Sequence, residues 1–378
     1  MFEQELGSLK ELGLLRELRT AVRVDGVRAV IEGRGCVLFC TNDYLGLASH
    51  PAVAAAARAS MDRIFGAGSA PLIAGRTPYH DRLEKDVASF KGAEAALLFG
   101  SGYLANVGLI PAVACEGDVI MSDSLNHASV IDGCRLSRAD IKIYPHCDVQ
   151  RLERLLKCAG NYRRRVIVTE GVFGMDGDVA PLPEIAALAR QYDALLVVDE
   201  AHSTGVLGRS GRGTFEHFGT DAHGAIQMGT LGKAVGSYGA FVAAGAGTVS
   251  WLVNSARSFM FSTALPPAVC ASASAGLRVI RDEPPLRARL HENAEALRAG
   301  LNSLGYKVSG AGTPIIPIFI GGADDAVKKS ARLFELGFFA PAIRPPTVPE
   351  GESRIRFTVS ALHAREDIEA LLYAMGKL

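Results

Sequence analysis

The sequence has no excess of charge of either sign. Its 378 residues include 40 Lys and Arg and 40 Asp and Glu, so the formal net charge is zero at pH 7. A balanced chain has no long-range field that would hold a nucleic acid or an anionic membrane surface. We therefore expect neither as a partner, and any anionic ligand must be bound by local chemistry.

Targeting segments and a disulfide framework are also missing. No uninterrupted apolar run reaches the length of a bilayer-spanning helix, and no basic stretch followed by an apolar core stands at the N-terminus. The seven cysteines are an odd number without regular spacing. We expect a cytoplasmic protein with reduced thiols.

One pair of cysteines could suggest a metal site, but the spacing of ligands that such a site needs is missing. Cys36 and Cys40 precede His50, but the residues between the two cysteines are apolar and typical of a strand. No second pair of ligands follows. We therefore expect no metal site.

The sequence does contain a regular alternation of short apolar runs with helical patterns. With 48% hydrophobic residues, a chain of this length can bury a large core. Parallel strands need crossovers of helix length, so the alternation predicts an α/β fold with a mostly parallel sheet covered by helices on both faces. Ligands in such folds bind beyond the carboxyl ends of the strands. The runs are Ala95–Phe99, Val119–Ser122, Ile141–Tyr144, Val166–Thr169 and Leu195–Asp199.

The pattern divides the chain into three parts. We expect an N-terminal helix and strand segment over residues 1–45, a large domain over 46–280 and a small C-terminal α+β domain over 281–378. In the first part, leucines at helical spacing predict an amphipathic helix over 3–20. In the last part, strands are predicted over 314–320 and 354–359, and helices over 325–336 and 364–376.

A carboxylate and a lysine follow two successive apolar runs. Asp199 ends the buried run Leu195–Asp199, where an unpaired charge is costly. A salt bridge or a helix cap would explain Asp199 alone. Lys233, flanked by glycines in Gly229–Ala234, adds an amine that can form an imine with a carbonyl cofactor. A carboxylate can keep the pyridine nitrogen of such a cofactor protonated, so the two residues explain each other.

The segment Gly100–Gly102 indicates a phosphate site, because a strand, a glycine turn and a helix N-terminus present free backbone N–H groups. The same segment matches the G-x-G-x-x-A dinucleotide pattern. The acids near the expected distance, Glu116 and Asp118, precede a strand rather than end one. His127 follows another run and either lies against an aromatic ring or serves as a capping or core histidine.

Several motifs in order along nearly the whole chain resemble one family, the pyridoxal-phosphate-dependent α-oxoamine synthases of fold type I. Such a resemblance implies a transferase with a mostly parallel large domain and a small α+β C-terminal domain. The motifs are Asn42–Leu47, Thr169–Asp178, Asp199–Gly205, Gly208–Gly213, Phe261–Thr263 and Arg354–Arg356.

The resemblance implies roles for residues around pyridoxal 5′-phosphate. Lys233 would carry the Schiff base, and Asp199 would contact the pyridine nitrogen. His127 would stack on the ring and His202 would bond the phenolic oxygen. The phosphate would be held by Gly102, Tyr103 and Thr230, and by Ser262 and Thr263 from a second subunit of a homodimer.

It also implies a substrate site. Arg356 would bind the amino-acid carboxylate, with Asn42 close to it. The segment 342–349, with Thr347, is most similar to the branch that condenses L-alanine with a pimeloyl thioester of coenzyme A or acyl carrier protein. Its prolines predict a rigid wall of the acyl channel. Arg16, Arg19 or Arg344 would pair with the far carboxylate of the pimeloyl chain, although a solvated helix face explains the first two equally well.

Two departures from the family pattern and three alternatives remain. Gly174 stands where members of the family often have serine, and Gly66–Leu72 lacks an arginine that is usual there. The alternatives are a sister synthase that uses glycine or serine with another acyl thioester, a nicotinamide dehydrogenase, and a non-enzymatic module of the same fold. The last two leave Lys233 and Asp199 unexplained.

Overall fold

The computed structural model describes residues 2–61, 65–309 and 312–378. It contains two compact units. One unit comprises residues 47–174 and 179–287, and the other comprises residues 1–46, 175–178 and 288–378. The N-terminal segment therefore shares a unit with the C-terminal part of the chain.

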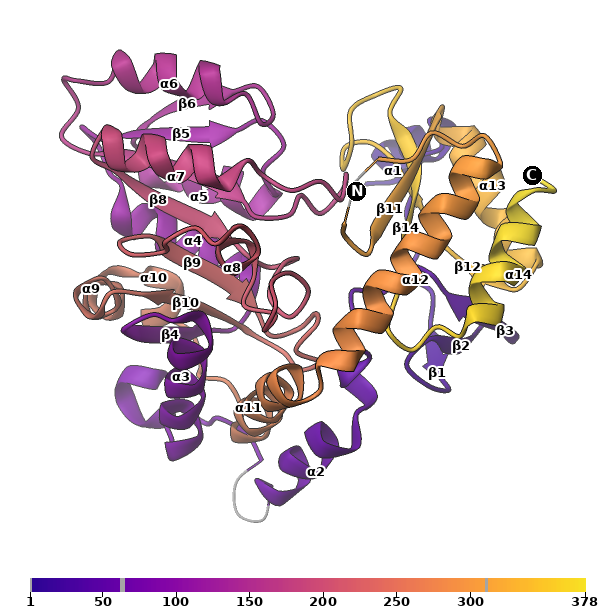
Figure 1. Cartoon of the computed structure of the whole chain (residues 1–378), viewed down its shortest axis with the longest axis horizontal. Helices are drawn as coiled ribbons and strands as arrows, with labels where there is room; N and C mark the ends of the chain where they lie inside the picture. Colours follow the sequence, from indigo (N-terminus) through magenta and orange to yellow (C-terminus); the bar gives the residue numbers. More distant parts are fainter. Residues whose placement is uncertain (1, 62–64, 310–311) are drawn as a thin grey trace. The chain divides into compact units, whose positions relative to one another are not determined.

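The larger unit is built on a seven-stranded sheet (Figure 1). Strands β8, β7, β5 and β6 are parallel neighbours, as the alternation of runs predicted. β9, which was not among the predicted runs, is parallel to β8. β10 is antiparallel to both of its neighbours, which the sequence had not indicated. In sheet order the strands are β4 (Ala95–Phe99), β10 (Ala240–Ala244), β9 (Ile226–Thr230), β8 (Ala194–Asp199), β7 (Arg165–Glu170), β5 (Val119–Asp123) and β6 (Asp140–Tyr144).

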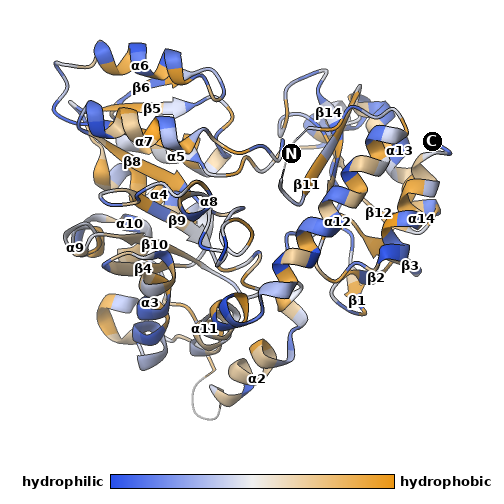
Figure 2. Cartoon of the chain, in the orientation of Figure 1, coloured by the Kyte–Doolittle hydropathy of each residue, from blue (hydrophilic) through white to orange (hydrophobic). Residues whose placement is uncertain are grey.

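Apolar side chains cover both faces of this sheet, since successive residues of a strand point to opposite sides. Val197 of β8 belongs to one core cluster, and its neighbours Leu196 and Val198 belong to the other. β8 accordingly appears as an apolar segment in Figure 2. The edge strand β6 differs, because Ile143 is 65% exposed.

Helices pack on each face. The first cluster includes residues of α4 (Gly102–Val113), α5 (Ala128–Ser137), α9 (Ala246–Ser255) and α10 (Arg257–Met260), and the second includes residues of α6 (Val149–Lys157), α7 (Leu182–Gln191) and α8 (Thr214–Phe218). The unit also contains α2 (Pro51–Ala59), the π-helical turn Pro71–Gly75, α3 (Pro78–Lys91) and α11 (Pro267–Asp282). Among the described residues, no helix combines the length and the apolar character needed to cross a bilayer.

The second unit holds two small sheets. β1 (Ala21–Arg23), β2 (Arg28–Ile31), β3 (Arg34–Leu38) and β12 (Phe338–Phe339) form one, and β12 is parallel to β3. The other has the order β11 (Ile315–Gly321), β14 (Ser353–Thr358) and β13 (Ala342–Ile343). Its helices are α1 (Glu3–Glu11), most of α12 (Pro284–Ser303), α13 (Ala323–Glu335) and α14 (Arg365–Met375).

The helix predicted over residues 3–20 is too long. Helix α1 ends at Glu11, and none of its residues is buried. Gly13 follows with a φ of +65°, a conformation that ends helices and that glycine adopts without strain. The apolar stripe continued past this residue in the sequence, but the helix does not.

A tight loop between β9 and β10 carries Lys233. The Leu231 N–H donates to the Gly239 carbonyl at 2.9 Å, and the Gly236 N–H donates to the Lys233 carbonyl at 2.9 Å. Gly236 has a φ of +72°, and a Cβ added there would lie 2.3 Å from the carbonyl carbon of Leu47. Both its conformation and its close approach to the 47–48 backbone therefore require glycine.

Gly236→Ala should destabilise the protein. The left-handed conformation alone costs a residue with a Cβ about 1–2 kcal/mol, and the contact with Leu47 adds to this. Gly247→Ala is a matched control, because no atom lies within 4 Å of its added Cβ. Urea unfolding should show a lower midpoint for Gly236→Ala than for Gly247→Ala. Equal midpoints would contradict the structural role of Gly236.

Candidate active site

Four strands of the larger unit end at one edge of the sheet with polar side chains. Glu170 and Asp199 are paired across the last positions of β7 and β8, and Thr230 ends β9. Asp123 ends β5, and His127 follows it at the start of α5. Because these strands are parallel, their carboxyl ends meet, and the edge predicted to bind ligand carries these groups.

Asp199 is a buried carboxylate with a defined orientation. It is 5% exposed. Its Oδ1 accepts a hydrogen bond from the Ala201 N–H at 2.9 Å, and its Oδ2 accepts one from the Asn106 amide at 2.8 Å. The same amide nitrogen donates to Ser129 Oγ at 2.9 Å. Asn106 therefore links the carboxylate to the start of α5.

His127 belongs to the same network. Its Nδ1 lies 2.8 Å from Ser129 Oγ and accepts from the Ser129 N–H at 3.2 Å. Partial loss of hydration lowers the pKa of His127, with Lys233 acting in the same direction and Asp199 opposing it. One side of the residue is nevertheless exposed. A neutral ring with one open side can stack on a planar ligand.

Lys233 and His202 are in direct contact. Lys233 Nζ lies 2.7 Å from His202 Nε2. Gly174 adjoins this pair, since a Cβ added at Gly174 would lie 2.6 Å from His202 Nε2. A serine at position 174, the residue frequent in the family, would thus require His202 to move. Glycine leaves the space that the histidine ring occupies.

Glu170 is a second buried carboxyl. The sequence placed it at the end of an apolar run but gave it no role. Its Oε1 accepts from the His127 N–H at 2.7 Å and its Oε2 from the Gly174 N–H at 3.3 Å. Burial raises the pKa of Glu170 to about 8, and the charge of Asp199 adds to the increase while Lys233 opposes it. The carboxyl joins the segment of His127 to that of Gly174.

The predicted phosphate site lies at the N-terminus of α4. The first N–H groups of a helix, here those of Gly102 and Tyr103, have no acceptor within the helix. A Cβ added at Gly102 would lie 4.0 Å from Thr230 Cβ, so the two predicted residues are neighbours. The Thr230 hydroxyl donates to the Gly239 carbonyl at 3.0 Å and accepts from the Gly232 N–H at 3.2 Å.

Ser262 and Thr263 line a small cavity of about 20 Å³ beside Gly100 of the same chain.

The glycine turn Gly100–Gly102 follows β4. This strand is an edge strand of the sheet and pairs antiparallel with β10. A dinucleotide turn follows a strand of a parallel βαβ unit. The topology therefore argues against the dehydrogenase interpretation of the glycine pattern.

These residues fit pyridoxal phosphate. An amine on Lys233 suits the aldehyde, and the oriented carboxylate of Asp199 suits a protonated ring nitrogen. The N-terminus of α4 suits a phosphate group.

The proposed substrate residues lie in the other unit. Arg356 is buried, and its Nη2 lies 3.3 Å from Asn42 Oδ1 and 3.5 Å from the Tyr44 hydroxyl. Tyr44, which the sequence did not suggest, donates to Asn42 Oδ1 at 3.2 Å. Burial raises the pKa of Tyr44 to about 12, against the opposing charge of Arg356. The hydroxyl therefore stays neutral and helps to hold the guanidinium.

The N-terminal arginines differ in their surroundings. Arg16 Nη2 donates to the Pro345 carbonyl at 3.0 Å, and Arg344 donates to the carbonyls of Gly13 and Leu15. Arg19 instead pairs with Glu32 at 3.3 Å. The exposed residue Thr347 donates its N–H to the Arg344 carbonyl at 3.1 Å. The structure thus brings Arg16, but not Arg19, to the segment of Arg344 and Thr347.

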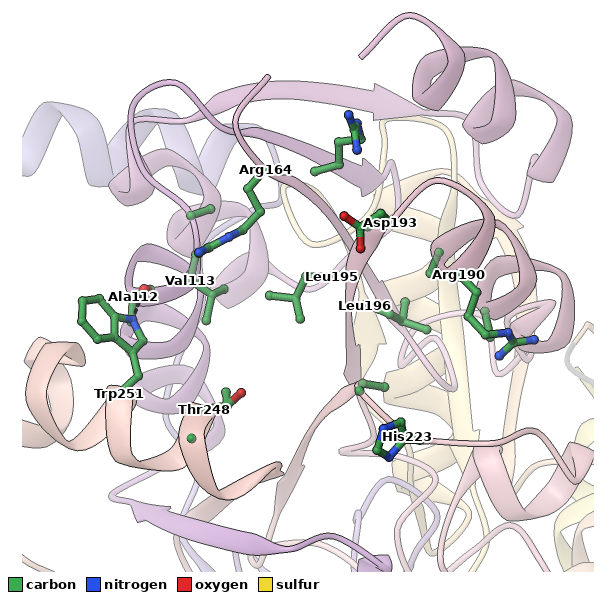
Figure 3. Close-up of a pocket in the computed structure, with 18 of the residues that line it drawn as sticks. Ala112, Val113, Arg164, Arg190, Asp193, Leu195, Leu196, His223, Thr248 and Trp251 are labelled. Carbon is green, nitrogen blue, oxygen red and sulfur yellow. Dashed lines mark hydrogen bonds between the residues drawn. The ribbon is translucent and has the colours of Figure 1, made fainter. Parts of the chain in front are cut away.

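The larger unit also has a cavity of about 1090 Å³ at the opposite edge of its sheet (Figure 3). It lies at the amino ends of β7 and β8, and its lining includes Arg164 and Trp251. Both side chains are bound to α4, since Arg164 Nη1 donates to the Val113 carbonyl at 2.6 Å and Trp251 Nε1 to the Ala112 carbonyl at 2.7 Å. The cavity is large, but it lies at the ends of β7 and β8 opposite to Glu170 and Asp199 and is therefore not part of the candidate active site.

Comparison with known proteins identifies a family model and relatives that match nearly the whole chain. The family model of the class I and II aminotransferases matches residues 34–375. An 8-amino-7-oxononanoate synthase of Geobacter sulfurreducens is 51% identical over 99% of this chain and 96% of its own length.

Two solved structures are similar over most of their length. Serine palmitoyltransferase (SPT) with PLP has a TM-score of 0.94 and 30% identity, covering 100% of this chain and 96% of its own. An 8-amino-7-oxononanoate synthase of Francisella tularensis has a TM-score of 0.79 and 29% identity, covering 90% of this chain and 97% of its own.

Glu170→Gln should change how stability depends on pH. In the PLP-free wild type, the folded chain holds the Glu170 proton up to about pH 8, whereas the unfolded chain loses it near the ordinary value of 4.5. The unfolding free energy should therefore fall as pH rises through this window. Glutamine cannot titrate, so melting temperatures of the variant should fall less.

Glu116→Gln, at an exposed carboxylate, serves as the control and should follow the wild type. If the melting temperatures of Glu170→Gln and wild type fall equally between pH 4.5 and about pH 8, Glu170 is ionised in the folded protein.

Proposed function

We propose that this chain, which belongs to the class I and II aminotransferases and within them to the 8-amino-7-oxononanoate synthases, condenses L-alanine with a pimeloyl thioester. The observation that carries the proposal is the 51% identity over 99% of the chain. The products would be 8-amino-7-oxononanoate, carbon dioxide and free thiol, in the biotin pathway. The acyl carrier is coenzyme A or acyl carrier protein.

The expected fold class and cofactor are confirmed. The mostly parallel sheet and the smaller C-terminal sheet, with the TM-score of 0.94 to SPT with PLP, identify a pyridoxal-phosphate enzyme of fold type I. When bound, pyridoxal phosphate supplies an aldehyde that takes up amines and a protonated ring that withdraws electrons from the amino-acid Cα.

Lys233 is the proposed general base. Its amine would take the proton from Cα of alanine, and His202, 2.7 Å away, would hold Nζ in position. The carbon so activated forms a bond to the thioester carbonyl, and the thiol leaves with the electron pair of the C–S bond. The bond from Cα to the carboxylate then breaks to release carbon dioxide, and Lys233 returns a proton to Cα.

Asp199 and His127 would orient the ring system. Asp199 would keep the pyridine nitrogen protonated, and its two hydrogen bonds fix the orientation of the carboxylate. His127 would cover one face of the ring. Asn106 and Ser129 would position Asp199 and His127 through their hydrogen bonds.

Substrate binding is proposed for residues of the other unit. Arg356, held by Asn42 and Tyr44, offers a planar guanidinium for the alanine carboxylate. The pKa of Arg344 is lowered mainly by burial and, to a smaller extent, by the positive charge of Arg16. Two adjacent cations beside Thr347 support a role in binding the far carboxylate of a dicarboxylic acyl chain.

A homodimer is also proposed. The family resemblance assigns Ser262 and Thr263 to the phosphate site of the second subunit, so each site would need both chains.

Lys233→Ala should abolish turnover without unfolding the protein. Loss of the base should lower carbon dioxide release by at least about a thousandfold, and borohydride should no longer fix the cofactor to the chain. Lys157→Ala, at an exposed lysine of α6, is the control and should retain full activity. Turnover by Lys233→Ala within tenfold of the control would remove Lys233 from the mechanism.

The acyl preference tests the function itself. Carbon dioxide and thiol release should be measured with pimeloyl, succinyl, acetyl and palmitoyl thioesters, each with alanine, glycine and serine. Pimeloyl thioester with L-alanine should exceed every other pair by at least about tenfold in kcat/KM, the size of effect that one well-placed contact gives. If glycine with a succinyl or acetyl thioester is preferred, or serine with palmitoyl, the chain is a sister synthase.

A further inference from the structure

Asp123, His146 and Cys147 form a cluster of possible metal ligands next to, but outside, the proposed cofactor site. Asp123 ends β5, and His146 and Cys147 follow the end of the parallel neighbour β6. Asp123 and Tyr144 are paired across the two strands, so the loops after them begin side by side. Asp123 is buried, whereas His146 and Cys147 are half-buried.

The three side chains converge on one point. His146 Nδ1 lies 3.0 Å from Asp123 Oδ1, and Cys147 Sγ lies 3.8 Å from His146 Nδ1 and 3.6 Å from Nε2. One ligand atom from each residue lies within 4.8 Å of the other two. The zinc–nitrogen, zinc–oxygen and zinc–sulfur bond lengths imply tetrahedral separations of about 3.3 Å between N and O and about 3.5 Å between N and S. The two separations measured from His146 are therefore close to those that a tetrahedral ion needs.

The surrounding contacts hold the ligands in place without an ion. Asp123 Oδ2 accepts from the Cys147 N–H at 2.8 Å, and Asp123 Oδ1 also accepts from the Leu125 N–H at 2.9 Å. The His146 ring meets the Phe173 ring edge-on, with centroids 4.3 Å apart. Hydrogen-bonded ligands with a fixed ring orientation are what metal sites require.

Cys147 also has an unusual backbone. Its φ is +56°, in the left-handed region that residues with a Cβ rarely adopt. Such a conformation persists only where the surroundings impose it and is concentrated at functional sites. In this conformation the Cys147 N–H donates to Asp123 Oδ2, and Cys147 Sγ lies 3.6 Å from His146 Nε2.

We propose that Asp123, His146 and Cys147 bind one divalent ion of the zinc class per chain, with water in the fourth position. Thiolate and imidazole ligands favour such an ion over Mg²⁺ or Ca²⁺. On binding, Cys147 releases its thiol proton to water and its sulfur forms the bond to the metal. The sequence predicted no metal site, and it gave no sign of this cluster because Asp123 precedes His146 by 23 positions and forms no regularly spaced ligand pair with it.

The test uses the chelator-treated holoenzyme and Co²⁺ as a spectroscopic probe. One equivalent of Co²⁺ should produce a thiolate-to-cobalt charge-transfer band together with visible bands of a four-coordinate ion, and Zn²⁺ should abolish both. Zn²⁺ should also raise the melting temperature, since it binds the folded state. These readouts do not depend on turnover, so they succeed or fail independently of the proposed synthase activity.

Two variants and a control locate the ion. Cys147→Asn keeps a side chain that tolerates a positive φ and should weaken Co²⁺ binding by roughly tenfold or more, the loss seen even for residues that only support ligands. His146→Gln should do the same. Cys158→Ser, at an exposed cysteine, should bind Co²⁺ as the wild type does. Wild-type protein that takes up no Co²⁺, or a Cys147→Asn variant with unchanged affinity and spectrum, would overturn the proposal.

Discussion

The buried carboxylate of Asp199 is the constraint from which the rest of the larger unit follows. A charge that is 5% exposed at the end of an apolar strand must be satisfied by neighbours. The Ala201 N–H satisfies one oxygen, and the Asn106 amide satisfies the other. Helix α4 must therefore lie close to β8, and the start of α4 is also where a phosphate would bind. One electrostatic requirement thus holds α4 against the end of β8.

A second buried acid completes this frame. Glu170 is the cross-strand neighbour of Asp199 in the sheet. Two negative charges on neighbouring carboxylates repel each other. Burial and the charge of Asp199 raise the pKa of Glu170, which favours a neutral carboxyl at this position. The neutral acid still accepts the N–H groups of His127 and Gly174. It therefore fixes two loops without competing with Asp199 for a cation.

The sequence predicted the features that depend on local pattern. Apolar runs predicted β8, β7, β5 and β6, and the rule that ligands bind at their carboxyl ends led to Asp199 and His127. Thr230 was implied only by the family resemblance. The contacts of Glu170 and Ser129 were not predictable, because they depend on which loops meet in space. Asn106 did leave a signal as the one polar side chain in the apolar stretch 104–113. β10 was not predicted as a strand, because its segment Ala240–Ala244 is rich in alanine, a residue that is depleted in strands.

The direction of β10 has a consequence for Lys233. Because β9 and β10 are antiparallel neighbours, the chain returns through the closed 231–239 loop and needs no helical crossover. The amine is thus tethered at both ends to the central sheet. A group on so short a tether has a high effective molarity toward its target. In the proposed reaction, one residue tethered in this way would serve both as the anchor of the cofactor and as the carrier of the Cα proton.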